Sequence, residues 1–260
     1  MRIALDGYLQ TKRKSISLWI LLILLLIRLT DSFPEERIWG EYGFYYFTFI
    51  SLAFLIFVIW LNKENFQLLN IDKPFLWLFL VTIILLFWYF HSSWLGILLG
   101  ASVVYLFFLV RTHKFDLGKH DANGKLSTFV YLAIGIIPIF VIGVLSNAFS
   151  NVQAFLQVGI EDVTWIITTR LWYAVFEELL FRGMLWMALK NFQITDKNIL
   201  IIQALFFWIA HLGKVSWLSF WLSVPLVSVW LGFLVMRSKS LTSSTVTHLA
   251  YNLTIYLMKN

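Results

Sequence analysis

Six side chains capable of acid–base or hydrogen-bonding chemistry lie in three apolar segments near the C-terminal end of the sequence. They are Glu177, Glu178 and Arg182 in AVFEELLFRG, His211 in FFWIAHLG, and His248 and Asn252 in TVTHLAYNLTIY. Ionisable groups within apolar membrane helices are costly, so they usually face the interior of a helix bundle and serve a function. We therefore expect the three segments to bring these side chains into one polar pocket.

Spacing along the first segment separates the two glutamates. On an α-helix Glu178 and Arg182, four residues apart, share a face, whereas Glu177 is turned about 100° away. Arg182 can therefore neutralise the Glu178 carboxylate and leave Glu177 to point elsewhere. A purely structural alternative is that both glutamates belong to a salt-bridge network that locks helices together.

The two histidine segments allow a similar choice between chemistry and packing. His211 follows Phe207 by one helical turn, and His248 and Asn252 are four residues apart and share a face. Histidine and asparagine also join transmembrane helices by hydrogen bonds without any catalytic role. The presence of all these polar groups on three otherwise apolar segments favours a common site.

Such a pocket has the groups needed to hydrolyse an amide. A carboxylate near a neutral histidine can orient and deprotonate water, and donors opposite can stabilise the oxyanion that forms. Glu177 and His211 suit the first task, and His248 and Asn252 suit the second. A zinc ion held by Glu177, His211 and His248 is the alternative. Because HExxH is absent and these ligands come from three segments, we favour water activation without a metal.

The elements that must position these residues are membrane helices. Of the 260 residues 60% are hydrophobic and 13% are charged, and the mean hydropathy is +0.80. A soluble domain has about 25% charged residues, so a water-soluble globule and a disordered chain are excluded. The absence of cysteine excludes thiolate ligands and thiol nucleophiles. We predict an all-α, polytopic transmembrane helical bundle.

Nine apolar stretches approach the length of about 20 residues that a membrane-spanning helix needs. They run over Ser15–Thr30, Tyr42–Leu61, Pro74–Phe90, Trp94–Val110, Thr128–Phe149, Asp162–Leu189, Asn198–Leu212, Trp217–Met236 and Leu241–Met258. The seventh is short, so eight spans are the alternative. Most Lys and Arg residues of the short loops fall on one side if the N-terminus is cytoplasmic. This predicts a multi-pass cell-membrane protein, and it explains the net charge of +6 without a nucleic-acid partner.

Three motifs in order resemble those of a known family. EELLFR fits EExxxR, FWIAH fits FxxxH and HLAYN fits HxxxN, as in the CPBP family of CAAX proteases and bacteriocin-processing enzymes. The resemblance covers Asp162–Met258. It implies that Glu177 activates water with help from His211 and that His248 and Asn252 form the oxyanion site. It further implies that Glu178 and Arg182 brace the site and that Phe207 packs beside it.

The predicted organisation is one integrated membrane domain. Residues 1–161 contribute about five N-terminal spans, and residues 162–258 form a CPBP-like catalytic core. We expect membrane lipids and a membrane-associated peptide or protein substrate as partners. The predicted function is an intramembrane endopeptidase. One alternative is a non-catalytic bacteriocin-immunity or scaffold protein of the same fold. Another is a small transporter or proton relay, which is disfavoured because the sequence shows no paired broken helices in matching halves.

Overall fold

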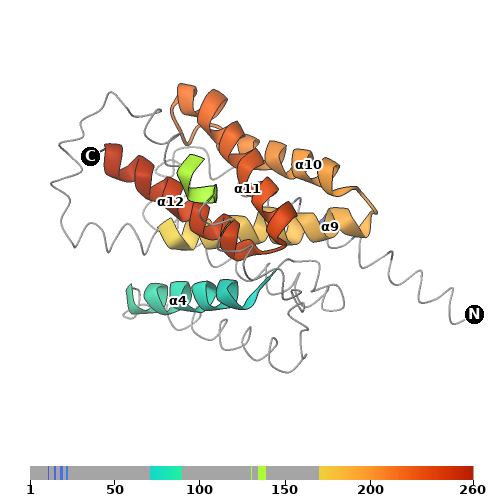
Figure 1. Ribbon diagram of the computed structural model, residues 1–260, viewed down its shortest axis with the longest axis horizontal. Coiled ribbons are helices and arrows are strands. Elements are labelled where there is room, and N and C mark those ends of the chain that lie inside the picture. Colours follow the sequence, from blue (N-terminus) through green and yellow to red (C-terminus); the bar gives the residue numbers. More distant parts are fainter. Residues whose placement is uncertain are drawn as a thin grey trace, which may run out of the picture.

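A computed structural model describes residues 11, 15, 18–19, 22, 71–89, 130, 134–138 and 170–259 of the chain. The described residues are helical and contain no strand (Figure 1). The elements are α4 (Lys73–Tyr89), a helical stretch at 170–178 that continues into the π-helix η3 (Leu179–Leu185) and α9 (Trp186–Asn191), then α10 (Asp196–Ile209), the π-helix η4 (Ser219–Ser223) with α11 (Val224–Ser238), and α12 (Leu241–Lys259).

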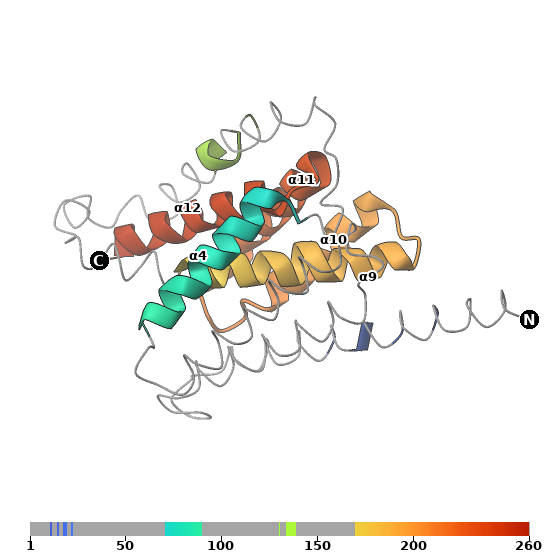
Figure 2. The ribbon, with the colours of Figure 1, turned by 90° about the horizontal axis from the view of Figure 1, so that it is seen from below.

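The helical stretch at 170–191, called the central helix below, forms the middle of the described bundle. From Leu171 to Leu189 every side chain except that of Tyr173 is buried. Phe75 of α4 and Phe207 of α10 belong to the same apolar core. In Figure 1, α4 lies on one side of the central helix and α10 with α11 on the other, and Figure 2 shows α4 crossing obliquely beside α12. A helix buried all round is a core helix, so its ionisable residues lie in the interior.

Close packing of α10 against α11 depends on a glycine. A Cβ atom on Gly232 would lie 1.9 Å from Nε2 of Gln203 and 2.6 Å from Cδ1 of Leu200, both on α10. A larger residue at this position would therefore require the Gln203 and Leu200 side chains to move, and small residues commonly allow such close packing in membrane bundles. This contact sets the distance between the two helices that carry Phe207 and Ser228.

A proline explains the widened turn at the start of α11. Pro225 has no backbone N–H, and in a regular helix its ring would clash with the carbonyl of Trp221, four residues earlier. The π-helix η4 lies immediately before this proline and includes Trp221. The indole Nε1 of Trp208 donates to the carbonyl of Phe220 within η4 at 2.7 Å, which ties the widened turn to α10.

The start of α12 is held by a buried carboxylate from α4. Asp72, just before α4, accepts hydrogen bonds from Ser240 Oγ and Thr242 Oγ1, both at 2.7 Å, and from the Thr242 backbone N–H at 3.4 Å. A carboxylate is favourable at a helix N-terminus because the unpaired N–H groups and the helix dipole are positive there. Asp72 therefore fixes α4 to the helix that carries His248.

The outer surface of the bundle is apolar, as expected of helices that face lipid. Ile201, Leu205 and Ile209 form an exposed stripe along α10, each one turn after the last. Among the described residues, one helical segment, Ser219–Ser238, is long and apolar enough to cross a membrane. The count of eight or nine spans is therefore not confirmed. The predicted spans Tyr42–Leu61 and Trp94–Val110, and most of Ser15–Thr30 and Thr128–Phe149, lie outside the described residues.

Where the prediction and the described structure overlap, helix positions agree closely and one end differs. The span predicted at Pro74–Phe90 corresponds to α4, and that at Leu241–Met258 corresponds to α12. The span predicted to continue to Leu212 instead ends as a helix at Ile209. The chain turns there over residues 210–214, where Gly213 has a φ of 77°. A positive φ is easily adopted by glycine, and the turn takes His211 off the helix.

Candidate active site

The central helix places three ionisable side chains in the bundle interior. Glu177 is 3% exposed, and Glu178 and Arg182 are completely buried. Arg182 Nη1 donates to Glu178 Oε1 at 3.0 Å, which confirms the pairing predicted from their spacing. The segment that holds Arg182 is the π-helix η3 and not the regular α-helix that the sequence pattern predicts. π-Helical turns are rare and occur frequently at functional sites.

Arg182 also connects the central helix to α10 and α11. Its Nη2 donates to the carbonyl oxygen of Ser228 at 3.2 Å. Its guanidinium lies over the ring of Phe207, 4.1 Å from the ring centroid. A buried charge is tolerated only when it is paired and hydrogen-bonded. The carboxylate, the carbonyl and the aromatic face stabilise the Arg182 guanidinium through Nη1, Nη2 and the ring contact, whereas its Nε has no hydrogen-bond partner among the described residues.

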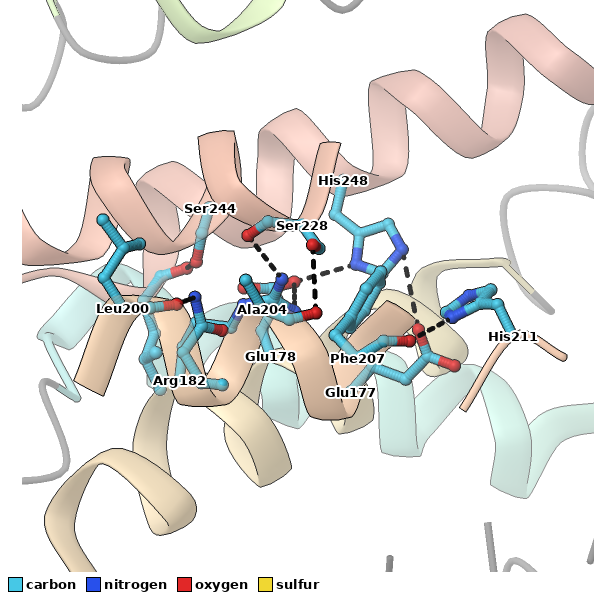
Figure 3. A network of polar contacts seen from close by, with 12 residues as sticks. Glu177, Glu178, Arg182, Leu200, Ala204, Phe207, His211, Ser228, Ser244 and His248 are labelled. Carbon is cyan, nitrogen blue, oxygen red and sulfur yellow. Dashed lines mark hydrogen bonds and ion pairs between the residues drawn. The ribbon is translucent and has the colours of Figure 1, made fainter. Parts of the chain in front are cut away.

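His248 on α12 lies between the two glutamates (Figure 3). Its Nδ1 is 2.9 Å from Glu178 Oε1, and its Nε2 is 3.7 Å from Glu177 Oε2. The first distance is a hydrogen bond, and the second is longer than the usual 2.7–3.2 Å range. Each ring nitrogen therefore faces a different carboxylate of the central helix.

His211 lies in the turn after α10, on the same side of the site as Glu177 (Figure 3). Its Nδ1 is 2.8 Å from the carbonyl oxygen of Phe207. Because a carbonyl oxygen only accepts, Nδ1 carries the hydrogen and Nε2 of the neutral ring has a lone pair. In a neutral ring of this tautomer, Nε2 is the nitrogen that can accept a proton.

Phe207 fills the space between the two histidines. Its buried ring lies 4.5 Å from the ring of His211 and 5.5 Å from that of His248, measured between centroids, and the second contact is edge-to-face. At about 1.5 Å per residue, the positions of the two histidines along their own predicted spans place them at different depths in the membrane. The structure brings both against one phenylalanine.

Asn252 follows His248 by one turn of α12 and is half-buried. The predicted pair of oxyanion donors thus lies on one helix. Contact of His248 with Glu177 and Glu178 was not predicted, because it joins two helices that lie about 70 residues apart in the sequence. The structure therefore brings Glu177, Glu178, Arg182 and His248 into direct contact, and the ring of Phe207 contacts both His211 and His248.

Ser228 is a residue of this site that the motifs did not indicate. Its hydroxyl is 3.1 Å from the carbonyl oxygens of Ala204 and Pro225, and its own carbonyl accepts from Arg182. It therefore links α10, α11 and the central helix. In the sequence, the feature that could have indicated Ser228 is a lone serine within the apolar run VPLVSVW. The structure shows that this serine is buried.

The alternative zinc site would use Glu177, His211 and His248 as its three ligands. A catalytic zinc site has three protein ligands that converge on one point. Within the part of the chain that the structure describes, no group of three His, Asp or Glu side chains has an arrangement that could hold a metal ion. The side chains of Glu177, His211 and His248, as arranged, do not fit a three-ligand zinc site.

Comparison with known proteins identifies the region that contains the site. No curated protein and no solved structure matches the chain. A family model described as type II CAAX prenyl endopeptidase Rce1-like matches residues 159–254. The match includes the three motifs and every site residue named above, and residues 1–158 lie outside it. Residues 159–254 of this chain are therefore similar to the Rce1-like type II CAAX prenyl endopeptidases.

Proposed function

We propose that the protein is an intramembrane endopeptidase that hydrolyses a peptide bond in a membrane-associated peptide or protein. One observation carries the proposal most strongly. Two buried glutamates of the central helix meet a histidine of α12 inside an apolar bundle, in a region that matches CAAX prenyl endopeptidases. That family supports a CAAX-type protease function. Buried, hydrogen-bonded ionisable groups that face one another are typical of acid–base catalysis.

In this proposal Glu177 is the base that takes a proton from the attacking water. Glu178 is paired with Arg182, and Glu177 occupies the first position of the EExxxR motif, to which the family resemblance assigns the base. His211 assists through Nε2, because its Nδ1 hydrogen is directed to the Phe207 carbonyl. Asn252 and a protonated His248 donate to the oxyanion of the tetrahedral intermediate. Arg182 keeps Glu178 in place, and Phe207 keeps the histidines apart.

The test is cleavage by purified protein in detergent of a library of membrane-associated peptides, followed by mass spectrometry. Wild-type protein and Glu177→Gln are compared, each with and without a chelator. Glutamine preserves the shape of the side chain and removes its ability to accept a proton. We expect the substitution to lower kcat by about 10²–10⁴-fold, the contribution of a general base, and chelation to leave cleavage unchanged.

Asp196→Asn is the matched control, because it makes the same carboxyl-to-amide change at the start of α10, in contact with Lys190 and Lys239 and not with the site. It should cleave as the wild type does. Full activity of Glu177→Gln would contradict the proposed base. Activity that chelation abolishes would favour a metal site. No cleavage by any variant would favour the non-catalytic immunity or scaffold alternative.

A further inference from the structure

We propose that Glu178 is a positioning residue which fixes the tautomer of His248, so that His248 Nε2 carries the proton from Glu177 to the leaving amine. This inference rests on the proposed peptidase function. It gives the second glutamate a task beyond bracing. It also makes His248 a proton carrier, which receives the proton of the attacking water, donates it in a hydrogen bond to the oxyanion and then protonates the leaving nitrogen.

The hydrogen-bond partners of Glu178 lead to this assignment. Glu178 Oε1 receives Arg182 Nη1 at 3.0 Å and lies 2.9 Å from His248 Nδ1. Arg182 is always charged and is completely buried, so it requires a charged partner in its immediate surroundings. An ionised carboxylate is only an acceptor. His248 Nδ1 must therefore carry a hydrogen and donate it to Glu178.

The tautomer of His248 determines what its other nitrogen can do. With the hydrogen on Nδ1, Nε2 of the neutral ring is an acceptor and cannot donate to an oxyanion. Nε2 faces Glu177 Oε2 at 3.7 Å. This distance allows proton transfer after a small approach or through one water, as catalytic contacts often tighten only when substrate is bound. Donation by His248 thus requires that it first receives a proton.

The groups around His248 suit this transient charge. Glu177 and Glu178 from the central helix face its two nitrogens, and Arg182 reaches it through Glu178. From α10 the ring of Phe207 contacts it edge-to-face, and the same ring contacts His211. An imidazolium at this position is held between two carboxylates, while Arg182 balances one of them.

In this proposal, these residues account for the proton that moves at each step of hydrolysis. One O–H bond of the water breaks, its oxygen bonds to the carbonyl carbon, and Glu177 takes the proton. Glu177 passes this proton to His248 Nε2 and becomes a carboxylate again. When the intermediate collapses, the C–N bond breaks and Nε2 gives the proton to the leaving nitrogen. His248 then returns to the neutral tautomer in which Nδ1–H faces Glu178.

The first test measures the tautomer directly and needs no substrate. Nitrogen-15 NMR of protein labelled at its five histidines distinguishes ring nitrogens with and without hydrogen, and the spectrum of His248→Gln assigns the His248 signals. We expect hydrogen on Nδ1 and none on Nε2 in the resting protein. Hydrogen on Nε2, in a neutral or a cationic ring, would overturn the proposal even if the protein is a peptidase.

The second test removes the acceptor without leaving a buried charge unpaired. In Glu178→Met/Arg182→Met both members of the ion pair are replaced by apolar side chains of similar length. We expect His248 to lose its fixed tautomer, kcat to fall about 10²–10⁴-fold, and KM to change little because substrate does not contact Glu178. An unchanged kcat in the folded double variant would overturn the proposal.

A conservative variant separates positioning from structural support. Glu178→Gln retains an oxygen that can accept the Nδ1 hydrogen but loses the charge that stabilises the imidazolium. We expect this variant to keep the wild-type tautomer and to show a kcat between those of the wild type and the double variant. If the double variant does not fold, the test compares Glu178→Gln with the wild type alone. We then expect a lower kcat and the same His248 tautomer in the nitrogen-15 spectrum. A Glu178→Gln ring with hydrogen on Nε2 would contradict the assigned role.

Discussion

Two acidic residues in this protein each meet two basic side chains in very different surroundings. Glu178 binds Arg182 and His248 in the interior, where all three side chains are at most 3% exposed. Asp196 binds Lys190 and Lys239 at the start of α10, where the three side chains are 31–49% exposed. The chemical pairing is similar, but the dielectric surroundings differ. Burial makes the first cluster strongly interdependent, whereas water screens the second.

This difference shows which cluster is suited to chemistry. At the start of α10, water can replace any lost partner, so the ion pairs secure the turn between α9 and α10 and little more. In the interior, no group can lose its partner without a large cost. Such interdependence fixes the orientation and tautomer of a histidine, which an exposed ion pair does not.

The largest effect on stability is expected when the interior ion pair loses one of its two members. Arg182→Met leaves the Glu178 carboxylate buried without its main counter-charge. We expect the free energy of unfolding to fall by about 3–5 kcal/mol, as for other buried pairs that lose one member. Reversible unfolding in mixed micelles, followed by circular dichroism, measures this loss. A loss below that of the Asp196→Asn variant would contradict the contrast between the two clusters.

Removing both members of the interior pair should restore most of this loss. In Glu178→Met/Arg182→Met no buried charge is left unpaired at these positions, and apolar replacements of buried ion pairs are often neutral or stabilising. The same unfolding measurement should therefore place the double variant well above Arg182→Met. Equal losses in the single and double variants would mean that the ion pair itself provides the stability.

A smaller effect is expected from the hydroxyl that links α10 and α11. Ser228→Ala removes the hydrogen bond to the Ala204 carbonyl but leaves the Ser228 carbonyl, which accepts from Arg182. We expect a loss of about 0.5–1.5 kcal/mol, the typical value of one hydrogen bond. Thermal unfolding in detergent measures it, and Ser219→Ala, at a half-buried position of η4, provides a serine control with a smaller shift.

The smallest effect on stability is expected at the exposed cluster. Asp196→Asn should cost about 0.2–1 kcal/mol at neutral pH, the range of surface ion pairs, and high salt should reduce this cost. Unfolding of the two proteins at low and high salt measures both quantities. A cost near that of Arg182→Met would show that exposure does not distinguish the clusters.

The pH dependence of this small effect has a defined direction. Partial burial raises the pKa of Asp196, but hydrogen bonds and charges from Lys190 and Lys239 outweigh it and lower the pKa below its ordinary 3.8. A carboxyl group with a lowered pKa stabilises the folded state fully above its unfolded pKa and loses this contribution as pH falls through the folded pKa. The stability gap between the wild type and Asp196→Asn should therefore persist at neutral pH and close below about pH 3.8.

The sequence by itself determined the apolar composition of the chain, the helical character of the residues that the structure describes, and the Glu178–Arg182 pair. These follow from composition and from spacing along one helix, where residues four apart are always neighbours. The three motifs also indicated the family that matches residues 159–254.

Only the tertiary structure decided which groups meet across helices. Spacing does not report the relative tilt and depth of two helices, so it paired His248 with Asn252 and did not predict its contacts with Glu177 and Glu178. Nor did it predict that the ring of Phe207 contacts both histidines. These contacts depend on how closely the helices pack and where their turns widen, and both are set by residues far apart in the chain.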